Sequence, residues 1–322
     1  MTRVRFGVIG AGRIARNAVG PAILASRNAT LHAAASRDIA RARALKPTRA
    51  YSSYDDLLND DEVDAVYIAT HNGLHKSITL AALTRGKHVL CEKPLAVSAI
   101  DCEEMLRAAK AANRHLVEAF MYRHHPQLSK VQGLLESKAI GDLMVVEASF
   151  RFPLKNHDDV RLQPEWGGGA LLDVGCYCVN VSRLFLGSDV VRISALASFH
   201  QSSGVDMSVQ GVLDYGNGRY AIVSCGFDAG RHQKVHLVGT DGVIQLNEPF
   251  NQPTGQPQIT LTTSRHQETI QVSNVNTFQL EVEDLADAIL NDSQPLLPPS
   301  DALANARVLD AIARAVRARE TP

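Results

Sequence analysis

The sequence lacks a charge excess of either sign. Its 33 Lys and Arg balance 34 Asp and Glu, which gives a formal net charge of −1 over 322 residues. A nucleic-acid-binding surface needs basic residues to neutralise phosphates, so we expect no nucleic-acid partner. Hydrophobic residues make up 45% of the chain and charged residues 21%. Those proportions are typical of a globular protein and exclude a disordered chain.

Long apolar runs and paired cysteines are also missing. No uninterrupted apolar run approaches the roughly 18 residues that a membrane-spanning helix needs. The N-terminal residues enter a strand pattern at once, so we expect no signal peptide and no membrane partner. The five cysteines are odd in number, and Cys176 and Cys178 are separated by a single residue, which is not a CxxC metal pair. We therefore expect reduced thiols in a cytoplasmic protein.

The first 121 residues are predicted to form an α/β Rossmann domain with a parallel, doubly wound sheet. Short β-branched runs alternate there with amphipathic segments of helical length, which is typical of βαβ units. The expected strands are Val4–Ile9, Leu31–Ala35, Val63–Ala69, His88–Cys91 and His115–Ala119. The expected helices are Arg13–Ala25, Ile39–Leu45, Tyr54–Leu58, His75–Thr84 and Ala99–Ala112. Ser98 with Asp101 predicts a helix start, and Gly86 a helix end.

Residues 122–322 are predicted to form a separate α+β domain with a large, mostly antiparallel open sheet. Consecutive strand patterns joined by tight turns favour antiparallel pairing. The expected strands are Leu143–Phe152, Val190–Ser198, Asp206–Tyr215, Arg219–Phe227, Lys234–Val238 and Ile259–Thr263. The expected helices are Gly169–Leu186, Thr277–Leu290 and Asp301–Arg319.

A dinucleotide-binding motif lies between the first strand and the first helix. Residues 10–15 read G-A-G-R-I-A. Gly10 permits the tight turn, Gly12 lets the backbone approach a pyrophosphate, and Ala15 supplies the small residue where helix meets strand. The helix N-terminus favours the anion. An ordinary strand–helix turn is the simpler interpretation, but the alternating pattern that follows favours nucleotide binding.

The end of the second strand bears on the choice between NADP and NAD. Ser36 and Arg37 stand there, and Asp38 follows. A guanidinium can bind the 2′-phosphate of NADP through two donors, whereas NAD sites usually place a carboxylate at this point. We therefore expect NADP, with NAD as the alternative. In the competing interpretation Arg37 is solvated and Asp38 only caps the next helix.

Three motifs together resemble the Gfo/Idh/MocA family, which is named for glucose–fructose oxidoreductase and inositol dehydrogenase. They are Glu92-Lys93-Pro94 at a strand end, residues 69–75 (A-T-H-N-G-L-H), and residues 167–177 (G-G-G-A-L-L-D-V-G-C-Y). The resemblance spans nearly the whole chain. Residues 118–123 (E-A-F-M-Y-R) are similar to the branch that holds sugar dehydrogenases, ketosugar reductases and dimeric dihydrodiol dehydrogenase.

The resemblance implies roles for individual residues. Lys93 would contact the nicotinamide ribose and the substrate oxygen, often with a cis bond to Pro94. Asp173 matches the aspartate of the substrate-domain motif, and Tyr177 stands where many members carry His. The expected cofactor contacts are Gly10, Gly12, Arg13, Ile14, Ser36, Arg37, Thr70, His71, Asn72, His75, Glu92 and Lys93. His71 replaces the usual Pro of the loop under the cofactor.

The residues themselves suggest acid–base chemistry. Asp173, Tyr177 and Asn180 are spaced to share one face of a helix. A tyrosine hydroxyl ionises at a pH of about 10 in water, and a nearby cation such as Lys93 would favour the phenolate. Tyr177 could then exchange the hydroxyl proton while the nicotinamide exchanges the hydride. Asp173 would orient the substrate or hold Lys93 charged.

Each of these residues also has a simpler interpretation. Tyr177 could be a packing residue, Asp173 a plain partner of Lys or Arg, and Lys93 a solvated charge. Trp166, the only tryptophan, either lines the substrate pocket or is a structural packing residue. The further substrate contacts are predicted to be Arg123, Trp166 and Asn180. No metal is expected, because the adjacent His124 and His125 do not converge easily on one ion.

The sequence therefore predicts an NADP-dependent oxidoreductase. The substrate would be a sugar or sugar-like polyol, oxidised at a carbinol carbon or reduced at the matching carbonyl. One rival is a trans-1,2-dihydrodiol dehydrogenase acting on cyclic diols. A non-enzymatic rival is a dinucleotide-binding redox sensor, which would not need Lys93, Asp173 and Tyr177 together. The resemblance also implies a homo-oligomer, a dimer or tetramer, assembled through the C-terminal sheet.

Overall fold

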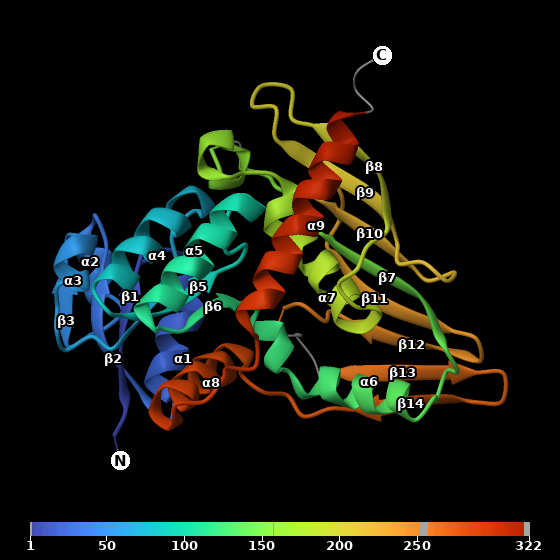
Figure 1. The fold of residues 1–322 in the computed structure, drawn as a ribbon, viewed down its shortest axis with the longest axis horizontal. Coiled ribbons are helices and arrows are strands. Elements are labelled where there is room, and N and C mark those ends of the chain that lie inside the picture. Colours follow the sequence, from blue (N-terminus) through green and yellow to red (C-terminus); the bar gives the residue numbers. More distant parts are fainter. Residues whose placement is uncertain (1, 157, 252–256, 319–322) are drawn as a thin grey trace. The chain divides into compact units, whose positions relative to one another are not determined.

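The structure, a computed structural model, describes residues 2–156, 158–251 and 257–318. The chain forms two compact units (Figure 1). The first contains the chain up to His124 together with Asn276–Ala306, and the second contains His125–Val275 together with the chain from Arg307 onward. A single boundary near residue 122 therefore does not describe the whole division, because residues 276–306 return to the first unit.

A six-stranded parallel sheet forms the centre of the first unit, in the order β3-β2-β1-β4-β5-β6. Its strands are β1 (Val4–Ile9), β2 (Ala29–Ala35), β3 (Arg49–Tyr51), β4 (Ala65–Ile68), β5 (His88–Glu92) and β6 (Leu116–Ala119). The strand order reverses between β1 and β4. Ligands of open α/β sheets bind beyond the carboxyl ends of the strands at such a reversal.

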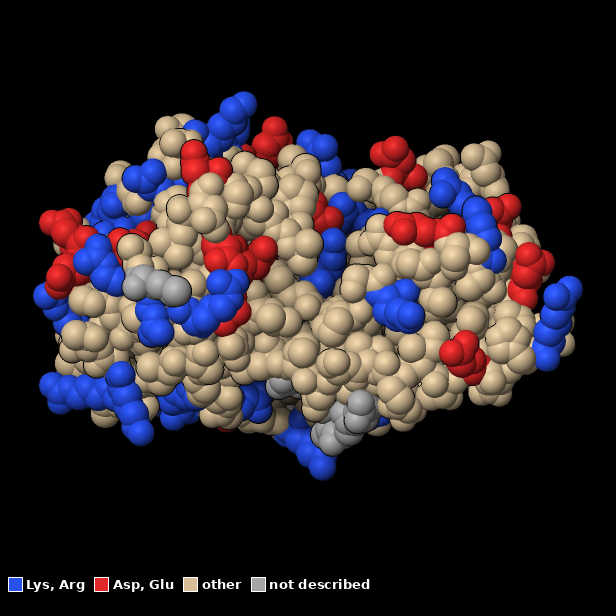
Figure 2. All heavy atoms as spheres, turned by 90° about the horizontal axis from the view of Figure 1, so that it is seen from below, with Lys and Arg blue, Asp and Glu red and all other residues tan. Residues whose placement is uncertain are grey.

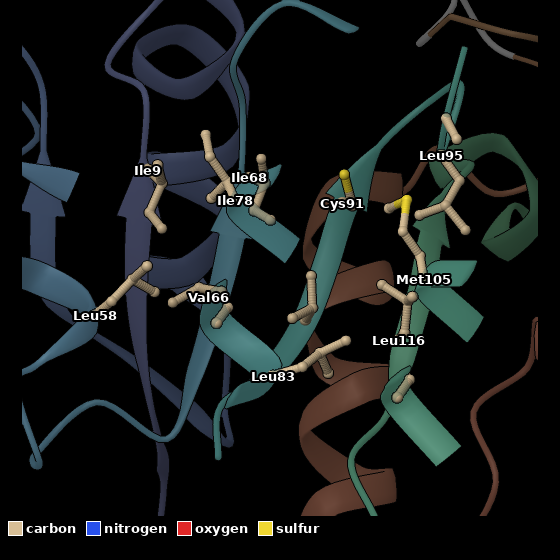
Figure 3. Close-up of a cluster of buried hydrophobic side chains, with 14 of the residues drawn as sticks. Ile9, Leu58, Val66, Ile68, Ile78, Leu83, Cys91, Leu95, Met105 and Leu116 are labelled. Carbon is tan, nitrogen blue, oxygen red and sulfur yellow. The ribbon is translucent and has the colours of Figure 1, made fainter. Parts of the chain in front are cut away.

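Helices cover both faces of this sheet, as the sequence predicts (Figure 1). They are η1 (Ala15–Val19), α1 (Gly20–Ala25), α2 (Ile39–Arg43), α3 (Tyr54–Leu58), η2 (Asn72–Leu74), α4 (His75–Thr84), α5 (Ala99–Ala112), η3 (Met121–His124) and α8 (Thr277–Asn291). Between α3, α4 and α5 and the sheet lies a buried cluster that includes Leu58, Ile68, Leu83 and Met105 (Figure 3). Helices α1 and α8 pack against each other and against β2.

Two helix boundaries of the first unit follow from single residues. The Ser98 side chain caps α5 by accepting a hydrogen bond from the Asp101 backbone N–H at 3.2 Å. Gly86 follows α4 with φ +72, the left-handed conformation that favours glycine after a helix. Both predicted caps are confirmed.

The second unit is built on an eight-stranded sheet in the order β14-β13-β12-β11-β7-β10-β9-β8. Only the β7–β10 pair is parallel among the described pairs. The strands are β7 (Leu143–Arg151), β8 (Arg192–Phe199), β9 (Asp206–Asp214), β10 (Tyr220–Gly226), β11 (His232–Gly239), β12 (Gly242–Asn247), β13 (Gln258–Thr263) and β14 (Gln267–Gln271). The predicted open, mostly antiparallel sheet is confirmed.

One face of this sheet carries the helix that the sequence predicts over Gly169–Leu186. It consists of a π-helical turn, η6 (Leu171–Gly175), and α7 (Cys176–Leu186), which lies across β7 and β10. The segment Pro164–Leu186 is long and apolar enough to cross a membrane by length and composition. However, 78% of its most apolar window is buried inside the structure, as expected for a core helix.

The other helices of the second unit come before and after the η6–α7 helix in the sequence. They are α6 (Pro126–Glu136), η4 (Val160–Leu162), η5 (Pro164–Trp166) and α9 (Pro299–Arg317), of which α9 begins in the first unit and ends in the second. The predicted end of the last helix, Arg319, lies outside the described residues.

Candidate active site

The turn after β1 has the backbone that a bound pyrophosphate needs. Gly10 adopts φ +93, and a Cβ at this position would lie 2.8 Å from the Ala69 carbonyl oxygen. No atom lies within 4 Å of a Cβ placed on Gly12, so the backbone there faces open space. Ala15 is fully buried at the start of the π-helical turn η1. The arrangement fits the phosphates of a dinucleotide, with glycine required at Gly10 by conformation and at Gly12 by access.

The contacts at the end of β2 bear on the two interpretations of Arg37 and Asp38. The Asp38 carboxylate caps α2, where it accepts a hydrogen bond from the Ala40 N–H at 3.0 Å and pairs with Arg41 at 3.3 Å. This carboxylate is therefore already engaged by the helix. Ser36 is buried, whereas Arg37 is exposed. An exposed guanidinium beside a capped Asp38 fits a 2′-phosphate better than a 2′-hydroxyl.

Lys93 stands directly after β5, at the carboxyl edge of the sheet. Its peptide bond to Pro94 is cis, as the resemblance implies. The Tyr67 hydroxyl donates a hydrogen bond to Glu92 Oε1 at 2.9 Å, and the Leu95 N–H donates to Glu118 Oε1 at 2.8 Å. The Glu92 side chain before Lys93 and the Leu95 backbone after it are therefore held by side chains of β4 and β6.

His75 contacts the Glu92-Lys93-Pro94 turn through its imidazole ring. The side chain is fully buried, with Nδ1 2.9 Å from the Pro94 carbonyl oxygen and Nε2 3.3 Å from the Thr70 carbonyl oxygen. Burial lowers the pKa of His75 to about 4, so the imidazole is neutral at pH 7 and carries one N–H. The shorter contact assigns that N–H to Nδ1. His75 thus joins the loop after β4 to the loop after β5.

The resemblance places His75 among the cofactor contacts, and that contact stays a prediction. A side chain with no exposed surface and both ring nitrogens facing backbone carbonyls acts as a brace. Its neighbours Thr70, His71 and Asn72, also predicted to contact the cofactor, are half-buried at the edge of the sheet. Arg13 and Ile14 are exposed on the first turn after the glycine loop.

In the second unit, Asp173 and Tyr177 lie where the π-helical turn η6 joins α7. Arg161 donates from Nε to Asp173 Oδ2 at 2.6 Å and pairs through Nη1 with Asp159 at 3.1 Å. The charge of Asp173 raises the pKa of Arg161, so the guanidinium stays charged. Sequence reasoning missed Arg161, because it lies 12 residues before Asp173 in the short helical turn η4 and belongs to no recognisable motif. Its ion pair matches the simpler interpretation of Asp173 as an arginine partner.

Tyr177 sits in an aromatic cluster. Its ring centroid lies 5.4 Å from those of Phe150 and Phe250, and 5% of the residue is exposed. The two phenylalanine rings hold the tyrosine ring by tilted contacts, which are favourable at this separation. The ring of Tyr177 is thus fixed by packing, as a positioned acid–base group requires.

The three expected substrate contacts differ in accessibility. Asn180 is fully buried in α7, so the expectation that it reaches a substrate is not supported by its position. Arg123 is nearly buried in the first unit, where it pairs with Asp301 at 3.4 Å. Trp166 is 38% exposed at the end of η5 and precedes Gly167, which adopts φ +72. Of the three, only Trp166 presents a substantial surface.

Two groups of potential metal ligands have other partners. His125 Nδ1 caps α6 by accepting from the Gln127 N–H at 3.1 Å, and His124 lies 3.3 Å from Asp284. Among the described residues, His32, Asp60 and Glu62 bring ligand atoms within 4.8 Å of one another. Both of these carboxylates pair with Arg49, and the Tyr51 hydroxyl donates to Asp60 at 2.8 Å. The guanidinium therefore already supplies the positive charge in that group.

Charged side chains of both signs are mixed on the face shown in Figure 2. Lys and Arg are interspersed there with Asp and Glu, and broad areas are uncharged. This distribution agrees with the net charge of −1.

A Rossmann unit with a glycine turn, joined to an open-sheet unit with an Asp–Tyr helix, defines a nicotinamide-dependent oxidoreductase. Residues 4–120 match the model of an oxidoreductase family with an NAD-binding Rossmann fold, and residues 128–245 match the GFO/IDH/MocA C-terminal domain. The chain belongs to the Gfo/Idh/MocA family of oxidoreductases.

Individual relatives cover between 78% and 98% of the chain. D-xylose 1-dehydrogenase (NADP(+)) 2 of Haloferax volcanii is 38% identical over 314 residues, 95% of each chain. Trans-1,2-dihydrobenzene-1,2-diol dehydrogenase of Xenopus laevis is 34% identical over 78% of this chain and 77% of its own. The crystal structure of a 3-ketoreductase from Actinomadura kijaniata, in complex with NADP and TDP-benzene, has a TM-score of 0.94. It is 31% identical over 98% of both chains.

Proposed function

We propose that this chain transfers a hydride between NADP and a carbinol or carbonyl carbon of a sugar or sugar-like polyol. The observation that carries the proposal is the Glu92-Lys93-Pro94 turn, held at the carboxyl edge of the sheet by Tyr67, His75 and Glu118. Buried supports on three sides fix the position of a lysine that a purely structural turn would not need. A xylose dehydrogenase and a ketosugar reductase among the relatives support the substrate class.

The cofactor would be held by residues of the first unit alone. The backbone at Gly10 and Gly12 would bind the pyrophosphate, and Ser36 with Arg37 would bind the 2′-phosphate. When bound, NADP supplies or accepts the hydride. Lys93 would donate a hydrogen bond from Nζ to the substrate oxygen and stabilise the negative charge that develops there.

Tyr177 would exchange the proton of the reacting hydroxyl through its phenolic oxygen. The packing of its ring against Phe150 and Phe250 would hold that oxygen in place. Asp173 is held by Arg161 and would orient the hydroxyl groups of the substrate. In this arrangement the carboxyl group of Asp173, paired with Arg161, would accept hydrogen bonds from sugar hydroxyls.

A substrate panel tests the proposal. Purified protein is mixed with NADP and aldoses or cyclic diols, or with NADPH and ketosugars, and the absorbance of the reduced nicotinamide is followed. Turnover of sugars above cyclic diols supports the proposal. Faster turnover of cyclic diols would favour the dihydrodiol interpretation, which the Xenopus laevis relative supports. Tight NADP binding without turnover of any member would favour a redox sensor.

We also propose that the protein is a homo-oligomer, a dimer or tetramer, in the cytoplasm. The sheet face opposite α7 exposes Leu196, Val212, Tyr220 and Ile222, with exposed fractions of 60%, 44%, 38% and 43%. Adjacent apolar side chains on three neighbouring strands favour burial against a second copy. The five cysteines are odd in number and lack paired CxxC spacing, which supports a reducing compartment. Cell fractionation with an antibody against this chain tests the location.

A further inference from the structure

The helix that carries Asp173 and Tyr177 begins without a cap of its own. Ala170 precedes the π-helical turn η6, and its side chain cannot accept a hydrogen bond from the first turn. The first N–H groups of any helix have no partner within the helix, and leaving them unpaired in a protein interior is costly. An acceptor from elsewhere in the chain is therefore needed at this point.

Asp206, the first residue of β9, supplies that acceptor from 35 residues away. The Leu171 N–H donates to Asp206 Oδ2 at 2.6 Å, and the Ala170 N–H interacts with the same carboxyl group. Gly169 adopts φ +111, and a Cβ on it would overlap Asp206 Oδ1. The carboxylate thus fills the space that a side chain at Gly169 would occupy. The Asp206 side chain thus joins β9 to η6 at Leu171, two residues before Asp173.

We propose that Asp206 is a positioning residue for catalysis, because its carboxylate fixes the start of the helix that presents Asp173 and Tyr177. The inference rests on the proposed function of those two residues. Asp206 touches neither substrate nor cofactor in this role and acts only through the helix. The relevant displacement is small, since catalytic groups must be held within about 0.5 Å of their productive position.

The ionisation of Asp206 argues against a role in stability alone. Burial raises the pKa of Asp206 to about 6, so the neutral form suits the folded protein better than the carboxylate does. A group with a raised pKa in the folded state stabilises most below its unfolded pKa, and this stabilisation is lost as the pH rises through about 6. At pH 7 the ionised form of Asp206 is therefore less favourable for stability than its protonated form. The contacts with Leu171 and Gly169 give this buried carboxylate its role, which is to hold the start of the helix.

The test compares Asp206→Asn with Asp214→Asn. Asp214 is the last residue of the same strand and accepts from the Gly216 N–H at 2.8 Å, away from the helix start. Each variant is assayed for kcat, KM, NADP affinity, Tm and amide hydrogen exchange of residues 170–175. For Asp206→Asn we expect kcat about tenfold lower, which corresponds to about 1.4 kcal/mol. Amide exchange of residues 170–175 should be faster and NADP affinity unchanged. The Tm at pH 7 should not fall, because the neutral amide replaces a carboxylate that burial disfavours. Asp214→Asn should leave kcat and this exchange unchanged.

A second variant approaches the same contact from the helix side. Gly169→Ala forces a methyl group towards the Asp206 carboxylate and should lower kcat in the same way, which covers the case in which Asp206→Asn does not fold. If amide hydrogen exchange of residues 170–175 is unchanged in Asp206→Asn, Asp206 does not cap the helix. Faster exchange with full kcat, while Tyr177→Phe is inactive, would overturn only the positioning role. Full activity of Tyr177→Phe would overturn the proposed function of that tyrosine, and the positioning role with it.

Discussion

At the scale of single residues, the site depends on side chains that neutralise or hold one another. Arg161 pairs with Asp173, and the Asp38 carboxylate caps α2, whereas Arg37 is exposed at the end of β2. The motif residues Lys93, Asp173 and Tyr177 could be named from the sequence, because each stands in a recognisable pattern. The supporting residues Arg161 and Asp206 could not, since each acts through a contact between separate segments. Glu118 lies in a motif that the sequence shows, but its contact with the Leu95 N–H was not predicted.

Cofactor preference is expected to depend on Arg37. Arg37→Ala should weaken NADP binding by roughly 10- to 150-fold, the value of one charged hydrogen bond of about 1.5–3 kcal/mol. NAD binding should change much less, because NAD has no 2′-phosphate. Fluorescence titration with both cofactors measures the two affinities, and Arg43→Ala, an exposed arginine of α2, is the control. Equal losses for NADP and NAD would contradict the assignment.

Lys93 is expected to act in the transition state. Lys93→Met should keep the fold and most of the cofactor affinity but nearly abolish kcat, because the lost interaction is with the reacting oxygen. Steady-state kinetics with a substrate from the panel, together with NADP titration, measure the effect. Lys110→Met, an exposed change on α5, is the matched control. A normal kcat with a raised KM would assign Lys93 to uniform binding instead.

Tyr177 is expected to carry the proton. Tyr177→Phe removes one hydroxyl and leaves the ring between Phe150 and Phe250, so the fold should be barely affected. If Tyr177 is the acid–base group, kcat should fall by about 10²–10⁴, and NADP affinity should hardly change. Tyr220→Phe on β10 is the control for the loss of a hydroxyl. A variant that retains more than about a tenth of kcat would make Tyr177 a packing residue and Lys93 the better proton donor.

At the scale of elements, periodicity located most helices and strands but missed those with weak patterns. β3 has three residues, and β14 (Q-E-T-I-Q) is mostly exposed, so neither shows an apolar face. α6 contains Gly133 in its interior, which weakens a helical prediction, whereas Pro126 at its first position is compatible with a helix start. β12 was also missed, although Ile244 and Leu246 are buried. The two π-helical turns, η1 and η6, were predicted as ordinary helix, because the extra residue of a π-turn leaves no mark on the apolar pattern.

Buried histidines should make the first unit sensitive to acid. Burial lowers the pKa of His75, beneath the Lys93 turn, to about 4, and His88 on β5 is lowered similarly. A histidine with a lowered pKa in the folded state contributes stability above its unfolded pKa of about 6.5. This stability is lost as the pH falls towards 4. The free energy of unfolding should therefore decrease by on the order of 1 kcal/mol per pH unit and histidine below about pH 6.5.

Urea unfolding at pH 7.5, 6.5 and 5.5 measures this dependence. His75→Gln cannot take up a proton, so its free energy of unfolding should fall less steeply with decreasing pH than that of the unaltered protein. His236→Gln, on β11 of the second unit, serves as the control. An equal slope for His75→Gln and the unaltered protein would show that His75 does not contribute to the acid sensitivity.

At the scale of the whole molecule, the exposed sheet face is expected to determine assembly. Val212→Lys places a charge in the centre of the apolar face formed by Leu196, Tyr220 and Ile222. The unaltered protein should have the mass of a dimer or tetramer by light scattering, and the variant should shift to a smaller species. Leu24→Lys, at an exposed position of α1, should leave the mass unchanged. A monomeric unaltered protein would contradict assembly through this face.

The sequence by itself determined the fold class, the phosphate turn and the family, because these depend on local patterns. Alternating apolar residues specify strands, Gly10 requires a conformation that other residues avoid, and Glu92-Lys93-Pro94 is contiguous. Only the tertiary structure decided that residues 276–306 join the first unit and that Asn180 is buried. It also decided that Asp206 caps a helix 35 residues away. Such features depend on which segments pack together, and that information is distributed over the whole core.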